Sequence, residues 1–158
     1  MDYFIKTHSM ATEIEHKYLV VDDSYKALAS ERHHITQGYL SRAHGRTVRI
    51  RLVDDHAVIT IKGTNQGATR LEFEYPIPVA DARQLLEMCE APIIEKTRHI
   101  VIDHSNRWEV DEFHGSLEGF TLAELEIPSE DYRYPLPSFV GENVTDNPHY
   151  YNSQLGLQ

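Results

Sequence analysis

Pairs of like charges two residues apart are the feature of this sequence that suggests chemistry. Acidic pairs occur at four places and basic pairs at two: Glu13/Glu15, Glu72/Glu74, Glu109/Asp111, Glu124/Glu126, Arg49/Arg51 and Lys96/Arg98. If each pair lies on a β-strand, its two side chains share one face, roughly 6 to 7 Å apart. Two carboxylates at that distance repel each other by about 2.5 kcal/mol at an effective dielectric near 20. A cation must therefore offset the charge of each acidic pair.

Two interpretations explain the charge pattern. An antiparallel sheet with one solvated face alternates charged and apolar residues without any function, and for a single strand this explanation is favoured. A solvated face, however, usually mixes the two signs to gain cross-strand pairs. A closed sheet with its charged faces inward accounts for all the pairs, because the basic strands then surround a polyanion and the acidic strands hold divalent cations. Carboxylate ligands without Cys or His favour Mg²⁺ or Mn²⁺.

The alternation of polar and apolar residues predicts the strands that position these pairs. We expect eight strands, at about 13–20, 34–40, 47–53, 57–62, 70–75, 94–103, 106–113 and 122–127. Pro76 and Pro78 are expected to end the fifth strand. Most of these strands follow one another directly, which is typical of hairpins.

Helices are predicted between and after the strands. The first is expected at about 25–31, and the second at 81–90, where Ala82, Leu85, Leu86 and Cys89 form an apolar stripe and residues 81–84 resemble a capping box. Two further short helices are expected near Phe139 and at 150–155. The fold class is therefore α+β: an eight-stranded antiparallel β-barrel, either a tunnel or an open cup, with helices packed outside.

Size and composition limit the organisation and the partners of the chain. With 158 residues, of which 41% are hydrophobic, residues 12–158 are expected to form a single domain and residues 1–11 a disordered leader. The formal net charge of -10 argues against a nucleic acid or an anionic membrane as the partner. The single cysteine, Cys89, excludes an internal disulfide and, with no apolar run of membrane-spanning length, indicates a cytoplasmic protein. We expect a monomer or a homodimer.

The ordered motifs resemble one known family. Glu13-x-Glu15-x-Lys17 is similar to the signature of the CYTH superfamily, the triphosphate tunnel metalloenzymes. Further matching motifs follow in order: Gln37-Gly38-Tyr39-Leu40, Arg49-x-Arg51, Thr60-Ile61-Lys62-Gly63, Arg70-x-Glu72-x-Glu74, Lys96-x-Arg98, Glu109-x-Asp111, Glu124-Leu125-Glu126, Val144-Thr145-Asp146 and Tyr150-x-Asn152. The resemblance covers almost the whole chain from Thr12 onward, and it implies a CYTH-like domain that binds a small triphosphate and a divalent metal.

The resemblance also implies roles for individual residues. Six basic residues are expected to contact the phosphates of the substrate: Lys17, Arg49, Arg51, Lys62, Lys96 and Arg98. Glu13, Glu15, Glu124 and Glu126 are expected to bind metal. Glu72, Glu74 and Asp111 are expected as further metal ligands or as residues that support the ligands.

Phosphoryl transfer requires neutralised phosphates and a water molecule held in line, with little covalent help from the protein. One metal ion would draw charge from the leaving pyrophosphate, and a second, on the Glu13/Glu15 side, would acidify the attacking water. Lys17 lies among acids that argue against a depressed pKa, so we expect it to contact phosphate or orient the water. Glu15, Lys17 and Arg51 form the predicted catalytic set.

The predicted activity is hydrolysis of inorganic tripolyphosphate to pyrophosphate and phosphate, because no part of the chain looks dedicated to binding a base or a thiazolium ring. Within the family, the alternatives are an adenylyl cyclase and a thiamine triphosphatase. Outside this class of enzyme, the alternatives are a non-catalytic module that binds polyphosphate or a nucleotide, and a structural β-protein whose charges are only solvated.

Overall fold

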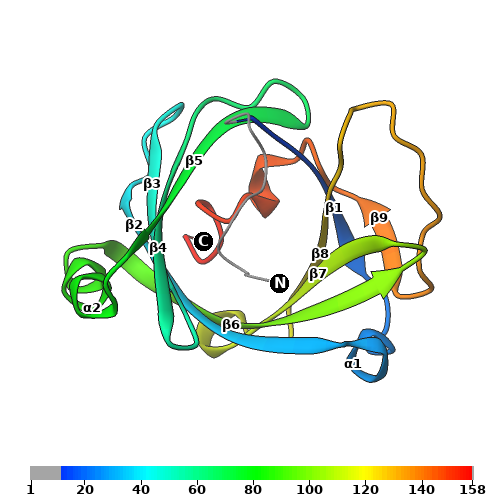
Figure 1. Cartoon of the computed structure of the whole chain (residues 1–158), viewed down its shortest axis with the longest axis horizontal. Coiled ribbons are helices and arrows are strands. Elements are labelled where there is room, and N and C mark those ends of the chain that lie inside the picture. The colour runs from blue at the N-terminus through cyan, green and yellow to red at the C-terminus, as the bar shows by residue number, and fades with distance from the viewer. Residues whose placement is uncertain (1–11, 158) are drawn as a thin grey trace.

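The computed structural model describes residues 12–157, so the expected leader at 1–11 lies outside the described residues. Nine strands form one antiparallel sheet that curls into a ring (Figure 1). The strands are β1 (Thr12–Val20), β2 (Glu31–Ser41), β3 (Thr47–Val53), β4 (His56–Lys62), β5 (Thr69–Ile77), β6 (Glu90–Asp103), β7 (Asn106–Phe113), β8 (Thr121–Glu126) and β9 (Val140–Asn143). Their order is β5-β4-β3-β2-β6-β7-β8-β1-β9, and an additional β5–β1 pairing closes eight of them into the predicted barrel.

The barrel closes at β1, the strand that carries the Glu13-x-Glu15-x-Lys17 motif. Residues 12–14 pair with β5, residues 15–19 pair with β8, and residues 18–20 pair with β9. Between the β5 and β9 pairings, the Glu15 backbone N–H donates to the Ala68 carbonyl at 3.1 Å and the Lys17 N–H donates to the Thr145 hydroxyl at 3.0 Å. These contacts hold β1 along its length and fix the direction of its charged side chains.

Apolar side chains cover much of the outside of the barrel. One cluster, centred on Trp108 and Tyr18, packs under α1 (Tyr25–Leu28) and the segment that ends at Phe139. A second cluster packs α2 (Val79–Glu87) onto β3 and β4 around Ile50. The two helices therefore lie outside the ring, as predicted (Figure 1). The outer face of β5 differs from this expectation, since Leu71 is 54% exposed and Tyr75 is 55% exposed.

A third apolar cluster closes one end of the lumen. Ile94, Phe113 and Leu122, which lie on the inward faces of β6, β7 and β8, pack against Val144 and Leu155 of the C-terminal segment. This segment, with the short 3-10 helix η2 (Pro148–Tyr150), lies within the ring of strands in Figure 1. The lumen is therefore a cup that is closed at this end.

Several predicted boundaries were wrong, for local reasons. The first helix ends at Leu28, because the Ser30 N–H already bonds to the Ile100 carbonyl at 2.8 Å and Glu31 begins β2. The second helix begins at Val79 rather than 81 and ends at Glu87 rather than 90. Its N-cap is Pro78, without a side-chain cap, so the predicted capping box does not form.

The proline-rich segments also differ from the prediction. β5 continues through Pro76 to Ile77, and after Leu71 the pairs described for it are all with β4. A proline is tolerated there because this part of β5 has a neighbouring strand on one side only, and a backbone N–H on the open side is not needed for pairing. The helix expected near Phe139 is absent from the described residues: Val140–Asn143 forms β9 on the remaining edge of β1. The expected helix at 150–155 is replaced by η2 and turns.

None of the helices in the described part of the chain has the length and apolar character needed to cross a membrane. A short 3-10 helix, η1 (Gly115–Leu117), links β7 to β8 and completes the regular elements.

Candidate active site

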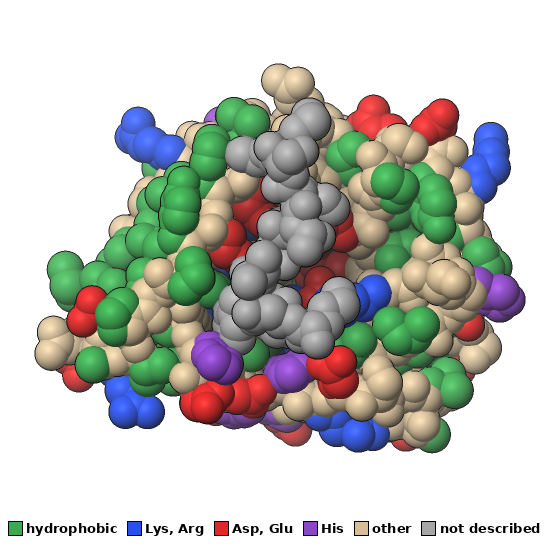
Figure 2. All heavy atoms as spheres, viewed as in Figure 1, with side chains coloured by type: hydrophobic (Ala, Val, Ile, Leu, Met, Phe, Trp, Pro, Cys, Tyr) green, Lys and Arg blue, Asp and Glu red, His purple; other side chains and the backbone are tan. Residues whose placement is uncertain are grey.

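The inward faces of the strands bring the predicted basic residues into one lumen. Each of the six is at most 8% exposed: Lys17, Arg49, Arg51, Lys62, Lys96 and Arg98. Lysine and arginine are almost never buried without partners. Figure 2 shows acidic side chains inside the hollow at the centre of the molecule, between apolar walls. The like-charge pairs read from the sequence therefore face one another across the barrel.

The predicted metal-binding acids share this lumen but differ in exposure. Glu13, Glu72, Asp111 and Glu124 are buried, Glu15 and Glu74 are partly buried, and Glu126 is exposed. Glu126 stands directly opposite Glu15 in the β1–β8 pairing, so the two side chains lie on the same face of the sheet.

Lys17 lies between two carboxylates. Its Nζ is 3.7 Å from Glu15 and 3.8 Å from Glu124. Burial on its own would lower the pKa of Lys17, but Glu124 and Glu15 outweigh it, and the pKa is raised. Lys17 is therefore a charged ammonium at neutral pH, which agrees with a role in contacting phosphate and not with a role as a base.

Glu15 and Glu124 form a carboxyl pair with too little positive charge around it. Burial, together with the charges of Glu124 and Glu13, raises the pKa of Glu15 well above its usual range. Burial opposes ionisation of Glu124 as well, but Lys17 and a hydrogen bond from Glu15 hold the pKa of Glu124 well below its usual range. The raised pKa of Glu15 reflects a shortage of positive charge around these carboxyl groups, which a divalent cation would offset.

Lys62 neutralises a second acidic group. Its Nζ lies 3.1 Å from Glu13 and 3.0 Å from Glu72, and Arg70 approaches Glu13 at 3.9 Å. Burial lowers the pKa of Lys62 to about 8, with Arg70 and Arg49 acting in the same direction against the attraction of Glu13.

The deepest ion cluster joins β6 to β7. Asp111 accepts hydrogen bonds from Lys96 Nζ at 2.6 Å and from Arg98 Nε and Nη2 at 2.7 and 2.8 Å, and Arg98 Nη1 also donates to Glu109 at 2.8 Å. Although burial opposes its ionisation, Arg98 and Lys96 hold the pKa of Asp111 far below its usual range. Burial lowers the pKa of Lys96 to about 7, assisted by Arg98 and Arg51. In this arrangement Asp111 aligns two cations, and its role as a metal ligand stays a prediction.

The two arginines of β3 are held by polar neighbours. Arg49 Nη2 donates to the Thr60 hydroxyl at 3.2 Å, and Thr60 donates in turn to Glu74 at 3.0 Å. Arg51 donates through Nε and Nη2 to the Gln37 carbonyl oxygen at 2.9 and 2.7 Å. These hydrogen bonds therefore hold each guanidinium in place, with its charge inside the lumen.

Gln37 and Asn152 are among the polar residues of the lumen that were missing from the predicted site. Gln37 is fully buried against Arg51, and Asn152 of the C-terminal segment donates to Glu124 at 3.5 Å. Both occur within motifs of the family resemblance, which was the available signal. Neither carries a charge, and the search for like-charge pairs passes over uncharged residues.

The donor chemistry of the lumen suits a hard cation. Within the described residues, no group of three or more His, Cys, Asp or Glu side chains is already arranged to hold a metal ion. However, the carboxylates of Glu15 and Glu124 lie 3.7 and 3.8 Å from the same Lys17 ammonium, and carboxylate oxygens are the ligands that Mg²⁺ and Mn²⁺ prefer. The residues present therefore fit a divalent metal.

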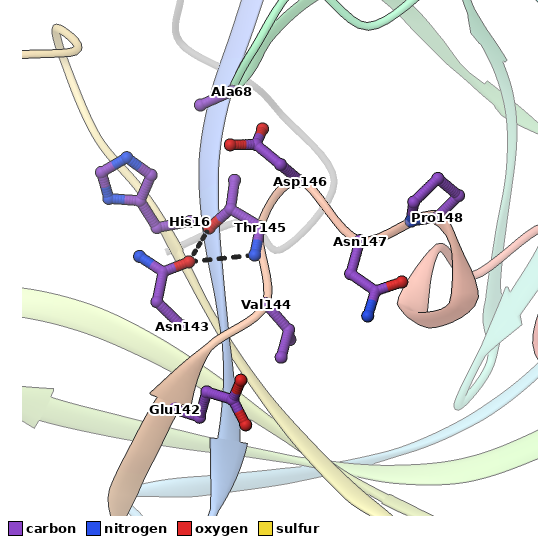
Figure 3. A pocket seen from close by; sticks show the side chains of 9 residues that line it. All are labelled: His16, Ala68, Glu142, Asn143, Val144, Thr145, Asp146, Asn147 and Pro148. Carbon is purple, nitrogen blue, oxygen red and sulfur yellow. Dashed lines mark hydrogen bonds between the residues drawn. The ribbon is translucent and has the colours of Figure 1, made fainter.

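A separate pocket of about 670 Å³ lies beside β1, lined by Ala68, His16 and the segment from Glu142 to Pro148 (Figure 3). His16 extends from β1 on the side opposite to Glu15 and Lys17, and its Nδ1 lies 2.6 Å from the Tyr134 hydroxyl. The lining contains no Lys or Arg. This pocket is therefore unsuited to a polyanion, and the basic lumen is the candidate active site.

The family profile of the CYTH domain matches residues 11–150. This chain belongs to the CYTH domain family. Its fold and the order of its charged motifs agree with that membership. Triphosphatases of the CYTH family are metal-dependent, which accords with the acidic side chains of the lumen.

Two curated relatives and one solved structure support this assignment to the CYTH family. An inorganic triphosphatase from Acetivibrio thermocellus is 44% identical over 147 residues, which cover 92% of this chain and 94% of the relative. An inorganic triphosphatase from Nitrosomonas europaea is 32% identical over 153 residues, which cover 92% and 97% of the two chains. A crystal structure of an inorganic triphosphatase matches with a TM-score of 0.66 and 30% identity over 92% of this chain and 98% of that chain.

Proposed function

We propose that this CYTH protein hydrolyses inorganic tripolyphosphate to pyrophosphate and phosphate with Mg²⁺ or Mn²⁺. The observation that carries the proposal is the burial of six basic side chains in one lumen, where they alternate with carboxylates. A multiply charged oxyanion is the ligand that such a set neutralises best. The names of the two curated relatives, both inorganic triphosphatases, support the same substrate class.

The closed end and the lining of the lumen favour a small substrate. The end near Ile94 and Leu155 is closed by packed apolar side chains, and aromatic residues such as Trp108 and Phe139 pack in the outer cluster instead of facing the lumen. The aromatic rings on the inward faces of the described strands, Phe113 and Tyr39, are only 0% and 4% exposed, so the lumen offers mainly charge and little aromatic surface for a nucleotide base. This supports an inorganic triphosphate over ATP or thiamine triphosphate.

We assign Lys17, Arg49, Arg51, Lys62, Lys96 and Arg98 to the phosphate oxygens. Hydrogen bonds fix Arg51 through Nε and Nη2 to Gln37, and they fix Arg98 through all three nitrogens to Asp111 and Glu109. The entropy of ordering both side chains is therefore lost before substrate binds. Lys17, held by Glu15 and Glu124, would contact the terminal phosphate or orient the attacking water.

We assign metal binding to Glu13, Glu15, Glu124 and Glu126, with Glu72, Glu74 and Asp111 as further or supporting ligands. When bound, the metal ions would neutralise the phosphate oxygens and acidify the attacking water. The carboxyl group of Glu15 would lose its proton as a divalent cation binds, because the cation stabilises the ionised form.

The direct test is release of orthophosphate from tripolyphosphate by the purified protein with Mg²⁺ or Mn²⁺. The same assay is run on ATP and thiamine triphosphate, and formation of cyclic AMP from ATP is measured in parallel. Preferred hydrolysis of tripolyphosphate supports the proposal. Preference for another substrate overturns the choice of substrate, and tight binding of tripolyphosphate without turnover indicates a binding module.

The cytoplasmic location and the monomeric or homodimeric state stay predictions from the sequence. Light scattering on the purified protein measures the oligomeric state directly.

A further inference from the structure

Gln37 is an uncharged side chain buried among the charged residues of the lumen. It lies in the middle of β2, directly opposite Arg51 on β3 and Ile94 on β6. Residues that stand opposite each other in a sheet project from the same face, so Gln37 faces the lumen between the basic cluster and its closed end. Its side chain is 0% exposed.

The hydrogen bonds of Arg51 determine which way the Gln37 amide points. Arg51 Nε and Nη2 both donate to Gln37 Oε1, at 2.9 and 2.7 Å. The reverse orientation of the amide would direct its N–H groups at the N–H groups of the guanidinium, and neither side would have an acceptor. Arg51 therefore turns the Gln37 Nε2 group away from itself.

The Gln37 Nε2 group has no hydrogen-bond partner among the described residues. A buried donor without an acceptor is destabilising, and such groups are rare in folded proteins. The buried Asp111 carboxylate does not supply the acceptor, since it accepts from Lys96 and Arg98. The donor is therefore available to a ligand that brings an acceptor into the lumen.

The chemistry of the site selects the class of ligand atom. An N–H donor beside a guanidinium matches an oxygen that only accepts hydrogen bonds, such as a phosphate oxygen. It does not match a metal cation, which the amide hydrogens would repel. Gln37 thus differs in function from the carboxylates of the same lumen.

We propose that Gln37 is a substrate-binding residue in which Oε1 holds the Arg51 guanidinium and Nε2 donates a hydrogen bond to a phosphate oxygen of the bound triphosphate. This inference rests on the proposed function, because it requires a triphosphate in the lumen. The neutral amide adds a donor at the closed end of the cup without adding another positive charge next to Arg51.

The experiment measures tripolyphosphate binding by calorimetry in the presence of a chelator, which prevents metal-dependent turnover. Gln37→Met removes both amide contacts at similar volume, and we expect its Kd to be about 10-fold or more above that of the wild type. Gln84→Met, the same substitution on the exposed surface of α2, is the matched control and should bind as the wild type does. Gln37→Glu retains an acceptor for Arg51 but lacks the donor, and it too should bind weakly.

A double variant separates direct contact with phosphate from simple support of Arg51. If Gln37 acts only by holding Arg51, adding Gln37→Met to Arg51→Ala changes nothing further. Our inference expects a further loss of about 10-fold in that background. An equal Kd for Arg51→Ala and the double variant, or binding by Gln37→Met and Gln37→Glu within twofold of the wild type, would overturn it.

Wild-type behaviour distinguishes this inference from the proposed function. A wild type that hydrolyses tripolyphosphate while the Gln37 variants bind normally leaves the function standing and rejects the role of Gln37. A wild type that binds without hydrolysis, with weak binding by the variants, supports Gln37 and rejects the enzyme. A wild type that neither binds tripolyphosphate nor hydrolyses it with Mg²⁺ or Mn²⁺ rejects both. Melting temperatures without ligand show that each variant is folded.

Discussion

Glu124 on β8 stands directly opposite Lys17 on β1, with 3.8 Å between the carboxylate and the ammonium. The carboxyl groups of Glu124 and Glu15 also share a hydrogen bond, so Glu124 touches both a cation and a second acid. We infer that Glu124 has two roles. Its charge holds the Lys17 ammonium that contacts phosphate, and one of its carboxylate oxygens binds metal.

We therefore expect Glu124→Gln to lower hydrolysis of tripolyphosphate by about 100-fold, comparable to loss of a preorganised electrostatic contact. The amide keeps the size of the side chain but has no negative charge to offset the positive charge of a metal ion. Steady-state rates at several Mg²⁺ concentrations check the prediction, and the variant should need more metal for half-maximal rate. Glu112→Gln, outside the lumen on β7, is the control. An unchanged metal requirement would contradict a ligand role for Glu124.

The Asp111 cluster makes a prediction about stability. Asp111→Asn leaves the buried Lys96 and Arg98 without their carboxylate, and removing one partner of a buried ion pair costs about 3 to 5 kcal/mol. We expect a lower free energy of unfolding for this variant in urea titrations without ligand.

Glu90→Gln provides the contrast, since it breaks the more exposed Arg42–Glu90 pair at 3.1 Å and should cost at most about 1 kcal/mol. Similar losses in Asp111→Asn and Glu90→Gln would show that the Asp111 cluster is not a main source of stability.

The sequence was a good guide to the barrel because strand alternation and charge are coupled in it. A residue such as Glu13 or Arg49 must face a polar interior if its neighbours Ile14 and Ile50 are to reach apolar packing. The same pattern located the eight strands of the barrel, although β2 begins at Glu31, β5 continues to Ile77 and β6 begins at Glu90, each beyond its predicted bounds. The pattern did not predict β9, since Val140–Asn143 pairs with the edge of β1 that β5 leaves open, and only the closed fold defines that edge.

The site was less predictable than the barrel. Spacing along a strand places Lys96, Arg98 and Asp111 on inward faces, but it does not say that Asp111 bonds both cations instead of facing a metal. Those contacts depend on the register of β6 against β7. Gln37 was missed for a related reason, since its importance comes from the neighbouring Arg51 and not from its own charge.

Removal of metal is expected to abolish hydrolysis. The Glu15 carboxyl has a raised pKa because burial and nearby acids disfavour its charge, and a divalent cation would reverse this. Treatment with a chelator should therefore stop phosphate release, and added Mg²⁺ or Mn²⁺ should restore it. Release of protons on addition of metal, measured in weakly buffered solution near pH 7, is a second readout. Hydrolysis that persists in excess chelator would contradict the role of the acids.

Binding of substrate should also raise the melting temperature. A ligand present at 100 times its Kd stabilises the fold by about 2.7 kcal/mol. We expect tripolyphosphate to stabilise the wild type and to have a much smaller effect on Arg51→Ala, since Arg51 is buried in the lumen. Thermal unfolding with and without tripolyphosphate measures the difference. Equal stabilisation of both proteins would place the anion outside the lumen.

His99 predicts a dependence of stability on pH that is separate from the active site. It is 4% exposed on the outward face of β6, where its ring contacts Tyr25 and its Nε2 lies 3.7 Å from Glu112. Burial lowers the pKa of His99, with Arg32 and Lys26 acting in the same direction and the carboxylate of Glu112 opposing them. The neutral ring therefore belongs to the folded state, while the unfolded chain binds a proton below about pH 6.5.

Below about pH 6.5 the unfolded state then binds more protons than the folded state. The contribution of His99 to the free energy of unfolding is therefore complete above this pH and falls as the pH decreases. We expect His99→Phe to reduce the loss of unfolding free energy between pH 7 and pH 5, because the substituted ring cannot be protonated. His44→Phe, at an exposed loop position, controls for the change of residue type. Urea titrations at each pH measure the slopes, and parallel slopes for wild type and His99→Phe would show that other groups govern the acid sensitivity.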